Sequence, residues 1–318
     1  MTQTLLLPAS PAAVSEAAAA LASGGLVAFP TETVYGLGGD ARDGRSVAAI
    51  YEAKERPSFN PLIAHVISLA EARKQGVFDA RADKLGTAFW PGPLTLVVPF
   101  AKSGTVHELA RAGLPTVALR VPAHPVARHL LEAFGAPVVA PSANRSGRVS
   151  PTSAEHVRAD LDGRVALILD GGRTPVGVES TVIACLPGEP VRLLRPGGLA
   201  RREIETVLGE PLADATDKVQ APGMLAQHYA PHAQVRLDAE DVASDEAWLG
   251  FGPAQPAGRP LASLNLSPSG DLAEAASNLF AHLRELDARK PASIAVAPIP
   301  ADGLGEAIND RLQRAAAR

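Results

Sequence analysis

The sequence predicts an α/β protein in which a domain with a twisted, mixed sheet is followed by a smaller domain with a parallel sheet. In the first two thirds of the chain, apolar runs of strand length outnumber helical patterns, and several follow one another directly. After residue 233 strands and helices alternate, as in a Rossmann-like parallel α/β domain. A stretch rich in Pro, Gly, Asp and Thr lies between. We therefore expect a first domain over residues 1–208, a linker over residues 209–233 and a C-terminal domain over residues 234–318.

The elements of the first domain follow from apolar periodicity and from helix-start signals. Asp43 is expected to cap one helix, and Thr152 another, because Glu155 follows Thr152 at the spacing of a capping box. Helices are expected over residues 11–23, 46–54, 80–89, 125–134 and 153–161. Strands are expected over residues 26–30, 62–66, 94–100, 116–121, 138–140, 165–169, 180–185 and 191–194.

The C-terminal domain is expected to alternate strands with two long helices. Its strands are expected over residues 234–237, 248–251, 261–266 and 293–299. Its helices are expected over residues 271–290 and 303–317.

The composition is typical of a globular protein. Apolar residues make up 46% of the chain and charged residues 20%, whereas aromatic residues, which could stack on single-stranded nucleic acid, are only 4%. The one cysteine, Cys185, excludes a disulfide framework and a multi-cysteine zinc site, and its apolar surroundings predict a buried small residue. We expect no metal held mainly by the protein. Because no signal sequence and no apolar stretch of membrane length are present, we expect a cytoplasmic location.

The net charge of −4 is unevenly distributed. Residues 1–207 hold 21 Lys and Arg against 19 Asp and Glu, a charge of +2, whereas residues 208–318 hold 9 against 15, a charge of −6. An anionic substrate is therefore expected in the first domain. The balance is far from that of a dedicated nucleic-acid-binding protein.

The most informative segment is residues 29–40 together with residues 54–62. The first part brings hydroxyls and glycines to the end of a strand, and the second brings Lys54, Arg56 and Asn60 to the end of the next helix. Lys54 and Arg56 could simply be cations that favour the helix macrodipole. A proline directly follows both Arg56 and Asn60, however, and forces an extended, stiff chain. We therefore favour a site for an anionic, phosphate-bearing ligand.

Other polar residues follow apolar strands in loops that contain hydroxyls and glycines, over residues 138–152, 171–181 and 194–198. Such loops supply ordinary turn and cap chemistry, but they also place N–H groups and hydroxyls around phosphate oxygens. Arg120, at the end of another strand, fits either a surface ion pair or a bidentate carboxylate clamp. The chain has no P-loop, no dinucleotide-binding glycine turn, no Gly-x-Ser-x-Gly elbow and no helical pair of metal-binding histidines.

In order along the chain, these segments resemble the Sua5/YrdC/YwlC family of threonylcarbamoyl-adenylate synthases. The matching motifs are Pro30-Thr-Glu-Thr-Val-Tyr-Gly-Leu-Gly38, Lys54-x-Arg56-Pro57-x-x-Asn60-Pro-Leu62, Trp90-Pro-Gly-Pro-Leu-Thr95, Leu119-Arg-Val-Pro122, Ala140-Pro-Ser-Ala-Asn144, Glu179-Ser-Thr181 and Leu194-Arg-Pro-Gly197. The resemblance covers residues 10–207. Residues 222–231 resemble the linker of the longer, Sua5-type members.

The resemblance implies a YrdC-like catalytic domain and a nucleotidyltransferase reaction. The family joins L-threonine, bicarbonate and ATP into threonylcarbamoyl-AMP and releases pyrophosphate, with Mg²⁺ accompanying ATP. The product serves the t6A modification at position 37 of tRNA. The resemblance therefore implies tRNA and the threonylcarbamoyl-transfer enzymes as downstream partners, and no membrane.

Site residues carry over position by position from the family. The positions that match the L-threonine site are Thr33, His65, Arg120, Ala140 and Ser180. Charge favours Arg120 as the group that holds the amino-acid carboxylate, whereas His65 could otherwise be a satisfied core histidine. The positions that match the ATP site are Arg56, Asn60, Thr116, Ser142, Ser150, Arg195 and Tyr229. Lys54 and Arg56 are the expected catalytic residues.

The linker is expected to close over the site, because a carbamate intermediate is unstable in water. Closure would bring His228 and Tyr229 toward ATP. Residues 225–227 read Leu-Ala-Gln where many family members have Lys-Tyr-Arg, which puts a cationic contact from the linker in doubt and leaves Tyr229 as the expected contact.

Two other functions fit related domains. An RNA-binding or accessory module is disfavoured by the small positive charge and the few aromatic residues. A carbamoyl-transfer maturation protein is disfavoured by the single cysteine, because those larger proteins carry additional zinc-binding cysteines.

Overall fold

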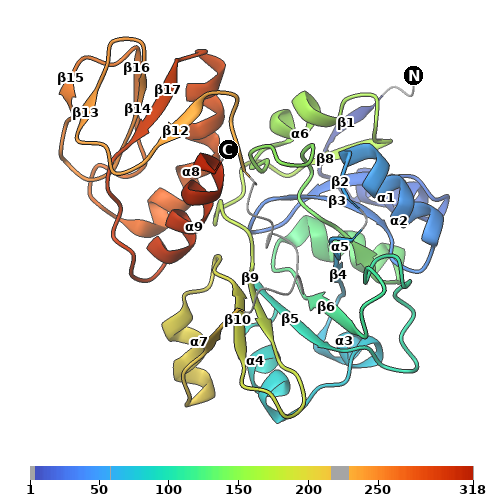
Figure 1. Ribbon diagram of the computed structural model, residues 1–318. Coiled ribbons are helices and arrows are strands. Elements are labelled where there is room, and N and C mark those ends of the chain that lie inside the picture. Colours follow the sequence, from blue (N-terminus) through green and yellow to red (C-terminus); the bar gives the residue numbers. More distant parts are fainter. Residues whose placement is uncertain (1–3, 58, 216–228, 318) are drawn as a thin grey trace.

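The computed structural model describes residues 4–57, 59–215 and 229–317, which form two sheet domains (Figure 1). In the described chain the larger sheet has 11 strands in the order β1-β8-β2-β3-β7-β4-β6-β5-β9-β10-β11, with parallel and antiparallel pairs. The strands are β1 (Leu5–Pro8), β2 (Val27–Pro30), β3 (Tyr35–Asp40), β4 (Ile63–His65), β5 (Leu94–Pro99), β6 (Thr116–Arg120), β7 (Val138–Val139), β8 (Leu167–Asp170), β9 (Thr181–Ala184), β10 (Arg192–Arg195) and β11 (Ala213–Asp214). The predicted mixed sheet is confirmed.

All the helices described in this domain except α7 begin at a side-chain cap. They are α1 (Pro11–Ala22), α2 (Gly44–Lys54), α3 (Leu69–Gln75), α4 (Ala80–Phe89), α5 (Pro125–Phe134), α6 (Ala154–Leu161) and α7 (Arg201–Leu208). Asp43 caps α2, as predicted, by accepting from the Arg45 N–H at 3.1 Å. The prediction of Thr152 as the cap of α6 is wrong. Ser153 holds that position and accepts from the His156 N–H at 3.4 Å, one residue later than the capping-box spacing suggested.

The two faces of the sheet are covered by different helices. Along β2, Val27 and Phe29 pack with residues of α1 and α5, whereas Ala28 between them packs with residues of α2 and α6 on the other face. This alternation follows from the period of two in a strand. Strands β4 and β6 continue the sheet beside the part that α1 and α5 cover.

Strand β3 was not predicted, because glycines replace the apolar residues that mark a strand. Gly38 lies so close to β2 that an added Cβ would be 2.8 Å from a ring carbon of Phe29. The glycine therefore lets β3 pack against a large aromatic ring. The short elements β1, β11, α3 and α7 were not predicted either.

The C-terminal domain has a parallel sheet in the order β12-β17-β14-β16, which confirms the predicted parallel α/β arrangement. Its elements are β12 (Gln234–Arg236), β13 (Asp241–Val242), β14 (Ala247–Gly250), β15 (Ala257–Gly258), β16 (Ala262–Asn265), α8 (Leu272–Ala288), β17 (Ser293–Val296) and α9 (Gly305–Ala316). Strands β13 and β15 form a separate pair. No helix in the described ranges is long and apolar enough to cross a membrane.

The segment expected as a linker begins in the larger sheet, because β11 pairs in parallel with β10. Residues 216–228, which include the expected contact His228 and the Leu-Ala-Gln sequence at 225–227, lie outside the described residues. The chain is described again from Tyr229, which is buried.

The two domains share one hydrophobic cluster. Val34, Val149 and Val178 of the first domain pack in the same cluster as residues of α8 and α9, which lie between the small sheet and the larger domain (Figure 1). Gly177 approaches α8 so closely that an added Cβ would be 2.4 Å from the Ala276 carbonyl oxygen. The interface therefore depends on a residue without a side chain at this position.

We expect Gly177→Ala to cost about 1–3 kcal/mol more stability than Gly188→Ala, because only the first overpacks a contact. Both glycines have positive φ, +77° and +73°, so both alanines carry the same backbone strain. Gly188 has no atom within 4 Å of an added Cβ, which makes it a matched control. Urea unfolding of both variants measures the difference, and equal losses would contradict the close interdomain packing.

Candidate active site

A polar pocket lies at the ends of the central strands. Ile63 and His65 of β4 and Arg120 of β6 point from the sheet into it, on the face that α1 and α5 cover farther along. Its lining residues are Thr33, Val34, Arg56, Ile63, His65, Arg120, Ala140, Pro141, Ser142, Glu179, Ser180, Arg195 and Tyr229. The free volume is about 40 Å³.

Arg120 forms a buried ion pair with Glu32 in this pocket. Its Nη2 lies 2.6 Å from Glu32 Oε1, and both side chains are more than nine-tenths buried. The Ala123 N–H donates to the other carboxylate oxygen at 3.0 Å. Burial favours the neutral carboxyl, but the charge and hydrogen bond of Arg120, together with the backbone N–H donors, outweigh burial and lower the pKa of Glu32. The pair leaves Arg120 Nη1 without a hydrogen bond to the described residues, so the guanidinium retains a donor for a ligand.

Arg56 and Asn60 present unsatisfied polar atoms. Arg56 donates from Nη2 to the Pro61 carbonyl at 3.2 Å, but its buried Nε has no hydrogen-bond partner in the described chain. The buried Asn60 Oδ1 also has none there. Burial, and to a smaller extent the nearby charge of Arg195, lowers the pKa of Arg56 to about 10. Because buried polar groups are costly without partners, both atoms indicate a polar ligand. The Arg56 Nε–H is a donor and suits an anionic group, whereas Asn60 Oδ1 can only accept a hydrogen bond.

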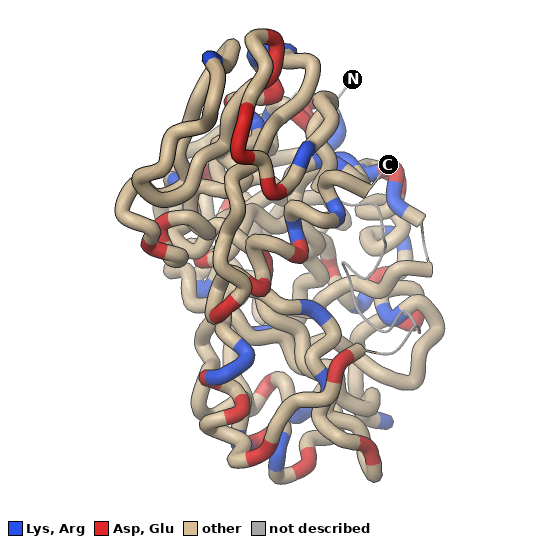
Figure 2. The backbone as a smooth tube through the Cα atoms, turned by 60° about the vertical axis from the view of Figure 1, so that its left-hand side comes forward, with Lys and Arg blue, Asp and Glu red and all other residues tan. Residues whose placement is uncertain are grey.

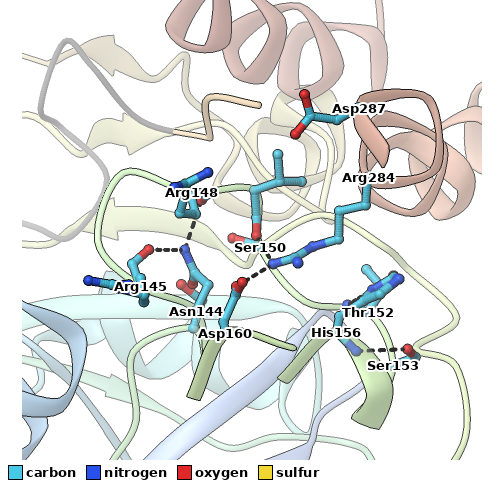
Figure 3. A network of polar contacts seen from close by, with 12 residues as sticks. Asn144, Arg145, Arg148, Ser150, Thr152, Ser153, His156, Asp160, Arg284 and Asp287 are labelled. Carbon is cyan, nitrogen blue, oxygen red and sulfur yellow. Dashed lines mark hydrogen bonds and ion pairs between the residues drawn. The ribbon is translucent and has the colours of Figure 1, made fainter. Parts of the chain in front are cut away.

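Lys54 is turned away from the pocket and supports one of its loops. Its ammonium donates to the Ser142 carbonyl at 2.5 Å and to the Asn144 carbonyl. The Asn144 side chain in turn donates to the Arg145 and Arg148 carbonyls at 2.9 and 2.8 Å (Figure 3). Burial lowers the pKa of Lys54 well below its ordinary value. In this structure Lys54 therefore positions Ser142, and it does not line the pocket.

His65 is a buried histidine without a partner on its Nδ1 atom among the described residues. Burial, reinforced by the charge of Arg120, lowers its pKa to about 3. The imidazole is therefore neutral at physiological pH. Its ring lies edge-on to Phe29, with ring centres 6.4 Å apart.

Ser180 and Arg195 hold each other at the junction of β9 and β10. Arg195 donates from Nη2 to the Ser180 carbonyl at 2.9 Å and to the Ser180 hydroxyl at 3.2 Å. The same hydroxyl lies 2.8 Å from the hydroxyl of Thr95. The loop after Arg195 packs directly on this segment, since an added Cβ on Gly197 would be 2.4 Å from the Glu179 carbonyl oxygen.

Glu179 connects the pocket to the C-terminal domain. Its Oε1 accepts from the Ser150 hydroxyl at 2.5 Å, and its Oε2 accepts from Nε of Arg311 at 2.7 Å. Burial alone would raise the pKa of Glu179, but the charges of Arg311 and Arg195 lower it to about 2. The Arg311 guanidinium also lies 5.0 Å from the ring centre of Tyr229.

The structure brings together most of the predicted site residues. The predicted positions that line the pocket are Thr33, Arg56, His65, Arg120, Ala140, Ser142, Ser180, Arg195 and Tyr229. Asn60 and Ser150 lie behind it as partners of lining residues. Thr116 begins β6, four residues before Arg120 and thus about 13 Å along the strand. Its part in a ligand site stays a prediction.

The acidic residues of the pocket and the contribution of the C-terminal domain were not predicted from the sequence. Glu32 and Glu179 both lie inside motifs that the sequence singled out, but no partner for either was evident there. Arg311 had no local signal, because it meets Glu179 across 132 residues.

Both carboxylates that lie at the pocket form ion pairs with arginines. Glu32 pairs with Arg120, and Glu179 pairs with Arg311. In the parts of the chain that the structure describes, no group of three His, Cys, Asp or Glu side chains could hold a metal ion.

The amino-acid sequence is similar to known proteins over nearly its whole length. Residues 19–197 match the family model described as Telomere recombination, which covers Sua5, YciO and YrdC, and residues 199–317 match the model described as Threonylcarbamoyl-AMP synthase, C-terminal domain. A threonylcarbamoyl-AMP synthase of Bacillus subtilis is 41% identical over 95% of this chain and 92% of its own length. One of Pyrococcus abyssi is 42% identical over 94% of this chain and 92% of its own length.

A solved structure extends the similarity to the fold. The crystal structure of P. abyssi Sua5 complexed with L-threonine has a TM-score of 0.88 and 38% sequence identity, and the match covers 99% of this chain and 97% of that one. The fold and pocket thus define a two-domain α/β protein of Sua5 type. The chain belongs to the Sua5/YrdC family of threonylcarbamoyl-AMP synthases.

We expect His65 to lower the free energy of unfolding as the pH falls. A histidine whose folded-state pKa is lowered from 6.5 to about 3 stabilises the fold fully above pH 6.5 and progressively less as the pH falls to 3. Between pH 7 and pH 5 the wild type should therefore lose about 2 kcal/mol more than His65→Asn. Urea unfolding at both pH values gives the two losses. Equal losses would show that His65 is not held neutral.

Proposed function

We propose that this protein synthesises threonylcarbamoyl-AMP and pyrophosphate from L-threonine, bicarbonate and ATP. The observation that carries the proposal is the convergence of three buried guanidinium groups, from Arg56, Arg120 and Arg195, on one pocket. The unpartnered Nε–H of Arg56, a residue that lines the pocket, adds a donor for an anionic ligand. Family membership supplies the substrates.

The two ends of the pocket suit the two larger substrates. We assign the triphosphate to the side of Arg56, Asn60, Ser142 and Arg195, because positive charge and hydroxyls there can bind phosphate oxygens. We assign L-threonine to the side of Arg120, whose remaining donor would bind the carboxylate. The P. abyssi relative was solved with L-threonine bound, which supports an amino-acid subsite in this fold.

The assigned residues at the threonine side are mostly neutral. His65 is uncharged at physiological pH, and Thr33 shares a hydrogen bond of 2.8 Å with Thr31. Ala140 offers only a small side chain, and Ser180 a hydroxyl. A neutral environment near the amine keeps it from being stabilised as an ammonium ion, which favours its attack on bicarbonate.

The chemistry needs positioning more than a protein nucleophile. The threonine amine adds to bicarbonate and water leaves, which forms a carbamate. A carbamate oxygen then attacks the α-phosphorus of ATP, and the bond to the β-phosphate oxygen breaks to release pyrophosphate. Arg56 and Arg195 would stabilise the charge on the phosphates, and burial of the site would limit hydrolysis of the carbamate. In this scheme Arg56 acts on the phosphates, whereas Lys54 acts through the loop that carries Ser142.

We propose that Mg²⁺ enters as the counter-ion of ATP. Both pocket carboxylates are ion-paired with arginines, so phosphate oxygens and water would be its main ligands. When bound, the ion neutralises charge on the leaving pyrophosphate.

Classification and partners follow from this reaction. The transfer of AMP to a carbamate makes the proposed enzyme a nucleotidyltransferase, and we place it in the cytoplasm with tRNA and the threonylcarbamoyl-transfer enzymes downstream. Figure 2 shows Lys and Arg interspersed with Asp and Glu along the chain, without one extended basic stripe in this view. The distribution favours small substrates over tRNA as the direct ligand.

The reaction is tested by product formation. Protein incubated with ATP, Mg²⁺, bicarbonate and L-threonine should release pyrophosphate and yield an adenylate with the mass of threonylcarbamoyl-AMP. Omission of threonine should stop both. Pyrophosphate release that continues without threonine would contradict the proposal.

Arg56→Ala should lower kcat/KM at least 100-fold, about 2.7 kcal/mol of transition-state stabilisation, because a buried cation beside the phosphates is lost. Arg45→Ala is the control, since that arginine is almost fully exposed on α2 and pairs only loosely with Asp43 at 3.7 Å. Steady-state kinetics and a melting curve are measured for both. A folded Arg56→Ala protein with wild-type rates would remove Arg56 from the site.

A further inference from the structure

We propose that Arg311 of the C-terminal domain is a positioning residue for the ATP side of the pocket, where it neutralises Glu179 and holds the adjoining chain. This inference rests on the proposed function for the identity of the ligand. It assigns to helix α9 a direct part in a site whose lining residues come from the first domain and from Tyr229.

Three contacts place Arg311 at the site. Its Nε donates to Glu179 Oε2 at 2.7 Å, and its Nη2 donates to the Pro196 carbonyl at 3.0 Å. Its guanidinium lies against the ring of Tyr229. Glu179 and Tyr229 line the pocket, and Pro196 directly follows the lining residue Arg195. One side chain therefore touches three segments that shape the pocket.

Arg311 depends on these contacts because its side chain is buried. Arg311 is fully buried, and it is the largest fully buried side chain in the described chain. A long cationic side chain is placed in a protein interior at high cost unless it is paired and hydrogen-bonded. Its second carboxylate neighbour, Asp310, is adjacent on α9 and also accepts from Arg314 at 2.9 Å. Glu179 is thus the partner that ties Arg311 to the pocket.

Electrostatics predict the direction of the effect. With Arg311 in place, the Glu179 carboxylate is paired on Oε2, and its charge is offset before a polyphosphate arrives. Without Arg311, an uncompensated carboxylate would face the phosphates across a buried, poorly screened pocket. Phosphate binding would weaken, whereas the threonine side, near Arg120 and Glu32, would change little.

The chain offers a matched control for domain docking. Arg201 on α7 pairs with Glu306 on α9 at 2.8 Å, so it joins the same helix to the first domain without lining the pocket. Arg284 on α8 forms a second such pair, with Asp160 at 2.6 Å (Figure 3). If the site needs only that α9 is packed against the first domain, loss of the Arg201 ion pair should weaken ligand binding as much as loss of Arg311.

The test measures binding of α,β-methylene-ATP, which cannot release pyrophosphate, and of L-threonine by calorimetry. Arg311→Met should weaken nucleotide binding at least tenfold and threonine binding less than threefold. Arg311→Lys, which keeps the charge, should bind the nucleotide within about threefold of wild type. Arg201→Met should bind both ligands as wild type does.

The double variant Glu179→Gln/Arg311→Met distinguishes charge from structure. It removes both partners, so nucleotide affinity should return to within about threefold of wild type, and it provides a folded protein if Arg311→Met alone is too unstable by its melting curve. A wild-type affinity in Arg311→Met, an equal loss in Arg201→Met, or a double variant no better than Arg311→Met would overturn the inference.

Different results would contradict the proposed function and the role of Arg311. If wild-type protein binds α,β-methylene-ATP but forms no threonylcarbamoyl-AMP, the reaction is wrong, and the variant series still decides the role of Arg311. If the product forms but the series shows no charge effect, the reaction stands and the inference is wrong. Absence of nucleotide binding in the wild type would overturn both.

Discussion

The burial of several arginines around one pocket is the constraint on which the rest of the structure depends. A guanidinium taken out of water needs an anion or a set of oxygens at hydrogen-bond distance. Glu32 meets this need for Arg120, and the Ser180 carbonyl and hydroxyl contribute to it for Arg195. Arg56 is only partly satisfied. The pocket therefore holds more arginines than carboxylates and carries a positive charge. A site that binds a polyphosphate and a carboxylate requires such a charge.

This constraint explains why the loops of the first domain are rich in proline and glycine. Backbone carbonyls can accept from an arginine or lysine where the chain is extended or tightly turned, because the carbonyls there are free of helix and sheet hydrogen bonds. The prolines at 57 and 61 bring the Pro61 carbonyl to Arg56, and Gly197 lets one loop lie directly on the segment of Glu179 and Ser180. In the same way Lys54 donates hydrogen bonds to two carbonyls of the loop that carries Ser142. In the proposed function, several short loops would together contact the phosphates, where a P-loop protein uses a single loop.

Local sequence predicted the elements well where a side-chain pattern encodes them. Helices α4 and α5 begin and end at the predicted residues. Side-chain caps from Asp79 and His124 explain where they begin, and Gly135 explains where α5 ends. Strand β3 escaped because its glycines are needed for packing against Phe29, a neighbour known only from the fold. Most residues that line the pocket were named from the family resemblance, whose motifs are also local in sequence. Their counter-ions were not, because Glu32 and Arg120 are 88 residues apart and Glu179 and Arg311 are 132 apart.

The proposed function gives the pocket a phosphate side at Arg56 and an amino-acid side at Arg120. Nuclear magnetic resonance of arginine Nε–H groups tests it directly, because Arg56 Nε has no partner among the described residues and should gain one from a ligand. We predict that α,β-methylene-ATP shifts the Arg56 signal and leaves Arg120 nearly unchanged, and that L-threonine shifts Arg120 and leaves Arg56 nearly unchanged. Signals that respond to both ligands alike, or to neither, would contradict the account.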